Sequence, residues 1–148
     1  GKKLPVYGDG KNVRDWLFVE DHAKAIDMVQ EQGRLFETYN VGGHNEKQNI
    51  EIINIIIDTL QEMLPADDPR RALVSKDLIT YVEDRKGHDR RYAIAPDKIK
   101  AEIGWYPETD FATGIKKTIA WFFEHEDWMK NVTSGDYQKY YDDMYANK

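Results

Sequence analysis

The chain has 148 residues, a formal net charge of -6, a pI of about 5.2 and no cysteine. This acidic balance argues against the extended basic face that binds nucleic acid or an anionic membrane. Without cysteine there is no disulfide, thiol nucleophile or cysteine-ligated metal, which suits a reducing cytoplasm. We expect one soluble domain over residues 1–148, with no run long enough to span a membrane.

The first half of the chain predicts short strands followed by helices. Residues 4–7 and 13–19 are extended and β-prone, and a glycine-rich turn separates them. A helix is predicted over 20–32, because it starts with two acidic residues and a glycine follows it. Residues 37–41 predict another strand, and apolar spacings of three and four predict a broadly buried helix over 50–64.

The second half continues the alternation. Residues 66–76 are polar and contain a proline, which indicates a surface loop before a strand at 78–82. Helices are predicted over 96–103, over 112–126 and in the tyrosine-rich tail 136–145. These alternating elements favour a small mixed domain of the α/β or α+β class.

A cationic segment, residues 84–92, lies between the strand and the helix that follows it. It holds three arginines, a lysine and a histidine. Arginine carries a planar fork of donors that fits phosphate oxygens, and Gly87 lets the backbone approach a ligand closely. The segment therefore indicates an anionic ligand. A solvated turn whose arginines pair with Asp84 and Asp89 would account for the same residues, so both interpretations stay open.

Motifs for a complete active site are missing from this sequence. No strand is followed by Gly-x-Gly-x-x-Gly, no phosphate loop ends in Gly-Lys-Ser/Thr, and we expect no catalytic Tyr-x-x-x-Lys pair. The four histidines are scattered, so no zinc site is expected.

Four motifs then follow one another along the chain: Leu4-Pro5-Val6-Tyr7-Gly8-Asp9-Gly10, Arg14-Asp15-Trp16-Leu17-Phe18-Val19-Glu20-Asp21-His22-Ala23, Tyr39-Asn40-Val41-Gly42-Gly43-His44-Asn45-Glu46 and Gly87-His88-Asp89-Arg90-Arg91-Tyr92. Together they resemble the C-terminal part of the dTDP-glucose 4,6-dehydratases, which belong to the extended short-chain dehydrogenase/reductases. The second motif is the most specific of the four. The resemblance extends over nearly the whole chain.

The resemblance implies the substrate-binding part of an NAD-dependent hydro-lyase that converts dTDP-glucose to dTDP-4-dehydro-6-deoxyglucose and water. In that family NAD takes hydride from sugar C4, water leaves across C5 and C6, and the hydride returns to C6. The Rossmann domain that holds NAD and the catalytic Tyr and Lys is not among these residues. The chain alone is therefore expected to be inactive, an excised or recombinantly produced portion. The family forms homodimers through the Rossmann half, so a monomer is expected here.

The resemblance also assigns substrate contacts near the start of the chain. Pro5 and Tyr7 would form the thymine-side wall, and Arg14 would bind the diphosphate. Core packing is the alternative role for Tyr7, and a cross-strand ion pair is the alternative for Arg14.

Four later residues complete the implied site. Asn49 would contact the nucleotide, or cap the helix that follows it. Arg85 and His88 would contact the diphosphate or sugar, although His88 could instead cap a loop through a backbone hydrogen bond. Tyr145 would close over the nucleotide, or lie in a mobile terminal helix. Lys86 departs from the family, which usually has proline there.

Two other functions fit the same residues. One is a free-standing, non-catalytic module that binds nucleotide diphosphates. The other is the substrate domain of a different nucleotide-sugar epimerase, reductase or decarboxylase, which would differ chiefly in its base preference.

Overall fold

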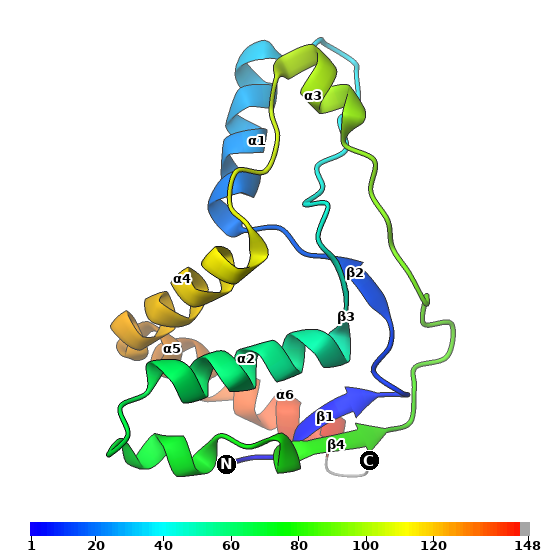
Figure 1. Cartoon of the computed structure of the whole chain (residues 1–148). Coiled ribbons are helices and arrows are strands. Elements are labelled where there is room, and N and C mark those ends of the chain that lie inside the picture. Colours follow the sequence, from blue (N-terminus) through cyan, green and yellow to red (C-terminus); the bar gives the residue numbers. More distant parts are fainter. Residues whose placement is uncertain (146–148) are drawn as a thin grey trace.

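The computed structural model describes residues 1–145, except for the side chains of four residues in the last helix: Asp136, Gln138, Asp142 and Tyr145. The strands are β1 (Leu4–Tyr7), β2 (Val13–Asp15), β3 (Glu46–Gln48) and β4 (Ile79–Val82). The α-helices are α1 (Val19–Gln32), α2 (Asn49–Met63), α3 (Asp97–Ile103), α4 (Phe111–Glu124), α5 (Glu126–Thr133) and α6 (Asp136–Tyr145). The expected mixed class of short strands and several helices is confirmed (Figure 1).

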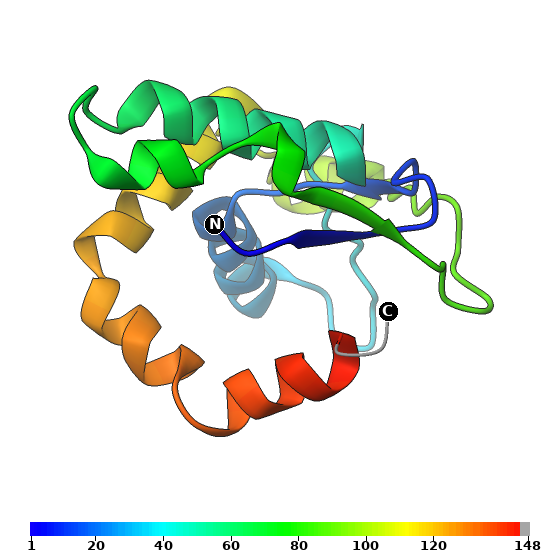
Figure 2. The same cartoon turned by 90° about the horizontal axis from the view of Figure 1, so that it is seen from below.

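Two small sheets organise one edge of the molecule. β1 pairs in parallel with β4, so that Tyr7 lies opposite Val82. Because parallel strands end at the same edge, the turn after β1 and the cationic segment after β4 leave the sheet side by side (Figure 2). β2 pairs with β3 in antiparallel fashion, and a bridge from Val13 to Arg91 draws the cationic segment along β2.

The hydrophobic core near α1 and α3 centres on one tryptophan. Trp105 is 1% exposed and packs with Ala25, Ile99 and Ile103. Its indole Nε1 donates to the Asp21 carbonyl oxygen at 3.1 Å, which satisfies the only polar atom of a buried ring. This contact ties the segment after α3 to the first turn of α1.

Helix α2 forms the centre of the other end of the molecule, as its apolar periodicity predicted (Figure 1). Ile52 and Ile57 are buried, and Ile56 lies at the edge of a cavity of about 370 Å³ between α2 and α4. Within residues 1–145, no helix is long and apolar enough to cross a membrane.

The predicted strand at 37–41 is wrong, and the strand forms later, at Glu46–Gln48. The Asp15 carboxylate accepts hydrogen bonds from the Gly43 and Asn45 backbone nitrogens at 2.7 and 2.8 Å. These two bonds satisfy backbone groups just before β3. Within 37–41, the Thr38 carbonyl accepts from Lys98 Nζ at 3.0 Å instead of from a neighbouring strand. The predicted strand 13–19 also ends early, at Asp15.

Other differences concern helix ends and loops. The connector 66–76 is not irregular throughout, because it contains the 3-10 helix Pro69–Leu73 and begins a second, Lys76–Leu78. The helix predicted over 112–126 ends at Glu124, and α5 was not foreseen. Asn49 is not the cap of α2: Gln48 holds that position and forms a capping box with Glu51.

Candidate anion-binding site

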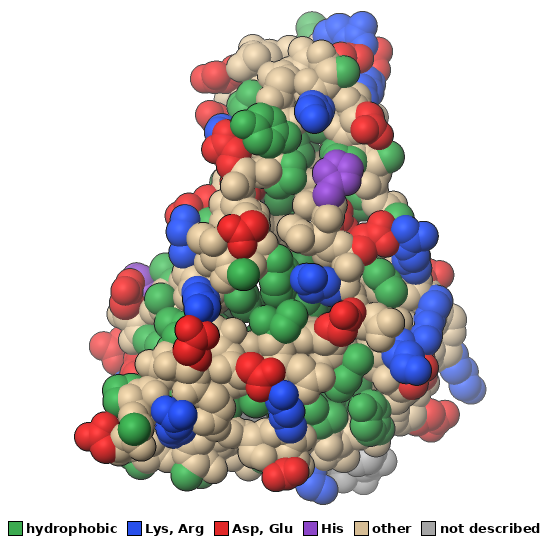
Figure 3. Space-filling model, viewed as in Figure 1, with side chains coloured by type: hydrophobic (Ala, Val, Ile, Leu, Met, Phe, Trp, Pro, Cys, Tyr) green, Lys and Arg blue, Asp and Glu red, His purple; other side chains and the backbone are tan. Residues whose placement is uncertain are grey.

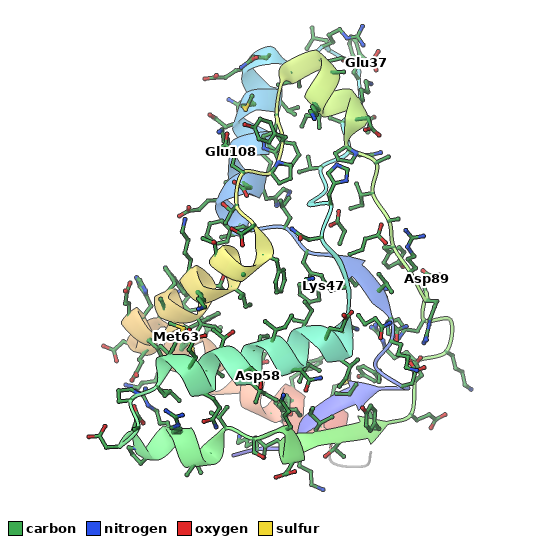
Figure 4. All side chains as sticks on the ribbon, in the orientation of Figure 1. Glu37, Lys47, Asp58, Met63, Asp89 and Glu108 are labelled. Atoms are coloured by element: carbon green, nitrogen blue, oxygen red, sulfur yellow. The ribbon has the colours of Figure 1, made fainter. Side chains whose placement is uncertain are left out.

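Two arginines from distant parts of the chain meet at one histidine nitrogen. Arg14 comes from β2, whereas Arg85 and His88 come from the loop after β4. Arg14 Nη2 lies 3.0 Å from His88 Nε2, and Arg85 Nη2 lies 2.9 Å from the same nitrogen. Figure 4 shows this crowded edge near the labelled Asp89, and in Figure 3 Lys and Arg side chains gather there.

The partners of His88 determine which ring nitrogen carries hydrogen. A guanidinium has only donors, so Nε2 must be the acceptor for both arginines. Nδ1 then carries the hydrogen and donates to Asp84 Oδ1 at 2.7 Å. This hydrogen bond is the main cause of a lowered pKa for Asp84, which keeps its carboxylate ionised. The His88 side chain is only 7% exposed, so the ring is enclosed by its partners.

The other two arginines of the segment are already neutralised. Arg90 forms a bidentate pair with Asp9, at 2.8 and 3.2 Å, and this pair lowers the pKa of Asp9 to about 2. Arg91 forms a similar pair with Glu46, at 2.8 and 2.9 Å. The solvated-turn interpretation named the wrong partners, because these two arginines pair with Asp9 and Glu46 and not with Asp84 and Asp89.

Arg14 and Arg85 differ from Arg90 and Arg91 in their partners. None of the ion pairs formed by the described side chains includes either of them, so the cross-strand ion pair considered for Arg14 is not found among those side chains. Arg14 donates instead to the carbonyl oxygens of Val13 and Asp89, at 2.7 and 3.1 Å. The two guanidinium groups thus lie side by side and donate to an imidazole nitrogen and backbone carbonyls, which are neutral acceptors. This arrangement suits an anionic ligand.

Two tyrosine rings flank the arginines. The Arg85 guanidinium carbon lies 5.1 Å from the centre of the Tyr7 ring, and that of Arg14 lies 4.4 Å from the centre of Tyr92. Tyr7 also meets the His88 ring edge-on, with centroids 6.3 Å apart. The half-buried Tyr7 therefore faces the cluster, and such cation–π contacts restrain the guanidinium groups without neutralising them.

The buried residue Asn12 is hydrogen-bonded to the backbone of the cluster. Asn12, 2% exposed, donates through Nδ2 to the Asp89 carbonyl at 3.2 Å, the same oxygen that Arg14 contacts. The backbone carbonyl oxygen of Asn12 accepts a hydrogen bond from the Asn49 backbone nitrogen at 3.0 Å. The predicted residue Asn49 is thus half-buried next to the cluster, at the start of α2.

The structure brings four of the seven predicted residues into contact: Tyr7, Arg14, Arg85 and His88. Pro5 lies two residues earlier on β1, opposite Thr80. The side chain of Tyr145 lies outside the described part. The backbone-cap role considered for the His88 ring does not match its contacts, because Nδ1 and Nε2 both meet side chains.

Three residues of the cluster were not predicted as site residues: Asn12, Asp84 and Tyr92. Asp84 and Tyr92 lie at the two ends of the cationic segment, which was their one sequence signal. Asn12 carried no such signal.

The glycine turn after β1 does not fit an NAD site. At Gly8, a Cβ atom would lie 2.9 Å from Asp84 Oδ2, and at Gly10 it would lie 2.8 Å from Val6, so protein atoms fill the space that a pyrophosphate would need. Tyr7 and Lys11 do have Tyr-x-x-x-Lys spacing, but they lie on opposite sides of this turn and not on one helix. No reaction step is assigned to them.

The chain is similar in sequence and fold to known dehydratases. Over all 148 residues the chain is 49% identical to dTDP-glucose 4,6-dehydratases of Shigella flexneri and Escherichia coli, and it spans 40% of their length. A crystal structure of the Bacillus anthracis dTDP-glucose 4,6-dehydratase with NAD matches with a TM-score of 0.72 and 47% identity, over 86% of this chain and 36% of that one.

A Streptomyces venezuelae dTDP-glucose 4,6-dehydratase, also solved with NAD, matches with a TM-score of 0.74 and 37% identity, over 86% of this chain and 36% of that one. The family model described as GDP-mannose 4,6 dehydratase matches residues 1–118. The chain therefore belongs to the GDP-mannose 4,6 dehydratase family, and its resemblance to the dTDP-glucose 4,6-dehydratases is confirmed.

Proposed function

We propose that residues 1–148 are the C-terminal, nucleotide-binding part of a dTDP-glucose 4,6-dehydratase and bind the diphosphate of dTDP-glucose. The observation that carries the proposal is the pair Arg14 and Arg85, two guanidinium groups held on one imidazole, neither of which forms an ion pair with a described carboxylate. The high identity to dTDP-glucose 4,6-dehydratases over the whole chain supports the choice of substrate.

In this proposal the diphosphate oxygens accept hydrogen bonds from the two guanidinium groups. Both groups have donors beyond those that His88 accepts, so they can bind the ligand without leaving the histidine. Pro5 and Tyr7 would meet the thymine, since they lie on β1 beside the cluster. Asn49 and Tyr145 would complete the contacts.

The chemistry of the reaction belongs to the rest of the longer protein. NAD would be held by a Rossmann domain, which would also supply the catalytic Tyr and Lys and the homodimer contact. We expect such an enzyme to work in the cytoplasm. The 148 residues alone would bind the nucleotide but would not dehydrate the sugar.

Calorimetric titration with dTDP, UDP and NAD tests the proposal. Arg14→Ala and Arg85→Ala should each weaken dTDP binding by about tenfold or more, the loss typical of a hydrogen bond to a charged group. Arg91→Ala is the matched control, because it removes the same charge from the same segment but from an arginine already paired with Glu46. It should change the affinity much less.

Four results would contradict the proposal. Absence of dTDP binding would contradict the existence of the site, and so would equal losses of dTDP affinity in all three arginine variants. Binding of NAD would contradict the assignment of the cofactor to another domain. Tighter binding of UDP than of dTDP would favour a different nucleotide-sugar enzyme.

A further inference from the structure

We propose that Asp84 is a positioning residue for this site, because its carboxylate holds His88 in the tautomer that lets one nitrogen accept from both arginines. The inference rests on the proposed function, since it concerns how the same anion site is built. Asp84 would not touch the ligand. It would act through His88 on Arg14 and Arg85.

The hydrogen-bond chemistry leaves one arrangement. An ionised carboxylate can only accept, so the imidazole nitrogen 2.7 Å from Asp84 Oδ1 must carry hydrogen. The other nitrogen, Nε2, then presents its lone pair to Arg14 and Arg85, at 3.0 and 2.9 Å. In the opposite tautomer Nε2 would carry the hydrogen, and this N–H would face the N–H groups of both arginines. The repulsion would push the two guanidinium groups away from the ring.

Asp84 is itself held in place by its surroundings. Its Oδ1 also accepts from the Arg85 backbone nitrogen at 2.8 Å, and the His88 backbone nitrogen donates to the Arg85 carbonyl at 3.1 Å. The parallel pairing of β1 with β4 brings the Gly8 backbone nitrogen to the Val82 carbonyl at 2.9 Å. The turn after β1 therefore closes directly against the Asp84 side chain.

This arrangement has a consequence for binding. Two long, flexible cationic side chains that repel each other would not normally stay side by side. A shared acceptor holds them there before the ligand arrives, so less conformational freedom is lost on binding. The carboxylate thus promotes the binding of an anion, although its own charge repels one.

These two effects predict opposite changes in anion affinity when the Asp84 carboxylate is removed, so one substitution can distinguish them. Asp84→Asn removes one negative charge beside the site, and charge alone predicts tighter binding of an anion. The amide can either accept from or donate to the ring, so it no longer selects the tautomer. Loss of positioning predicts weaker binding. Glu46→Gln is the matched control, because it also removes a carboxylate partner of the segment but does not contact His88.

We would measure dTDP binding by calorimetry and the His88 tautomer by ¹H–¹⁵N NMR of the imidazole, using the 148-residue chain. The unmodified chain should show hydrogen on Nδ1 only, and Asp84→Asn should show a mixture of tautomers. Its dTDP affinity should fall by about tenfold, as for one lost hydrogen bond to a charged group. Glu46→Gln should keep the tautomer and should bind dTDP as well or better.

Two results would overturn the inference while leaving the proposed function intact. One is hydrogen on His88 Nε2 in the unmodified chain. The other is unchanged or tighter dTDP binding by Asp84→Asn when the unmodified chain binds and the two arginine variants do not. If the unmodified chain fails to bind dTDP, the proposed function fails and the ligand part of the inference fails with it.

Discussion

Substituting Gly8 by alanine should weaken ligand binding at the anion site. The accompanying loss of folding stability should be no larger than for alanine at any other position with a left-handed backbone conformation. Gly8 has a φ of 57°, in the left-handed region, and its hydrogen atoms face the Asp84 side chain. A Cβ atom there would lie 2.9 Å from Asp84 Oδ2 and 3.1 Å from its Cγ. Carbon and oxygen cannot approach so closely, so the carboxylate must turn away.

The magnitude has two separate parts. The left-handed conformation costs an L-residue roughly 1–2 kcal/mol in folding free energy, whatever surrounds it. The clash adds little to that cost, because a carboxylate that is 40% exposed can rotate into solvent. Rotation, however, breaks the 2.7 Å hydrogen bond to His88, and we expect about a tenfold loss in dTDP affinity from that one bond.

Gly104→Ala is the matched control for this experiment. Gly104 has a similar φ, 79°, ends α3 and has no atom within 4 Å of an added Cβ. Urea unfolding should show a similar loss of stability in both variants, and calorimetric titration with dTDP should show weakened binding only in Gly8→Ala. Equal affinities in the two variants would refute the role assigned to the contact between Gly8 and Asp84.

Three further predictions concern the rest of the fold. Trp105→Ala should lower the free energy of unfolding by about 3–5 kcal/mol, as for other large aromatic deletions in a core; a loss below ~1 kcal/mol in urea unfolding would contradict its central place. Asp110→Ala should cost about 1 kcal/mol in the same assay, because Asp110 caps α4 by accepting from the Thr113 backbone nitrogen, and an unchanged midpoint would argue against the cap. Hydrogen bonds from the Arg90 side chain and, second, from the Lys11 backbone nitrogen lower the pKa of Asp9 from 3.8 to about 2, so these contacts should contribute stability above pH 3.8 that is lost as the pH falls toward 2. Asp9→Asn should flatten acid unfolding in that window, and a profile identical to that of the unmodified chain would contradict the contribution of these contacts.

Local sequence patterns determined most of the elements. The apolar spacing of the second helix predicted α2 within one residue of its observed start and end, and β4 begins one residue after the predicted start. Such patterns report on backbone geometry that is decided within a few residues. They failed at 37–41, where the Thr38 carbonyl accepts a hydrogen bond from Lys98 Nζ, 60 residues away, instead of joining a strand ladder.

The composition of residues 84–92 likewise indicated an anion site, but it could not say which arginines serve it. That depends on partners far along the chain: Asp9 lies 81 residues from Arg90, and Glu46 lies 45 residues from Arg91. Arg14 reaches His88 across 74 residues. The pairing of β1 with β4 and of β2 with β3, together with the bridge from Val13 to Arg91, brings these groups together. The sequence alone therefore determined the kind of ligand that the segment favours, whereas the tertiary structure decided which charges remain available, because neutralisation requires contact in space.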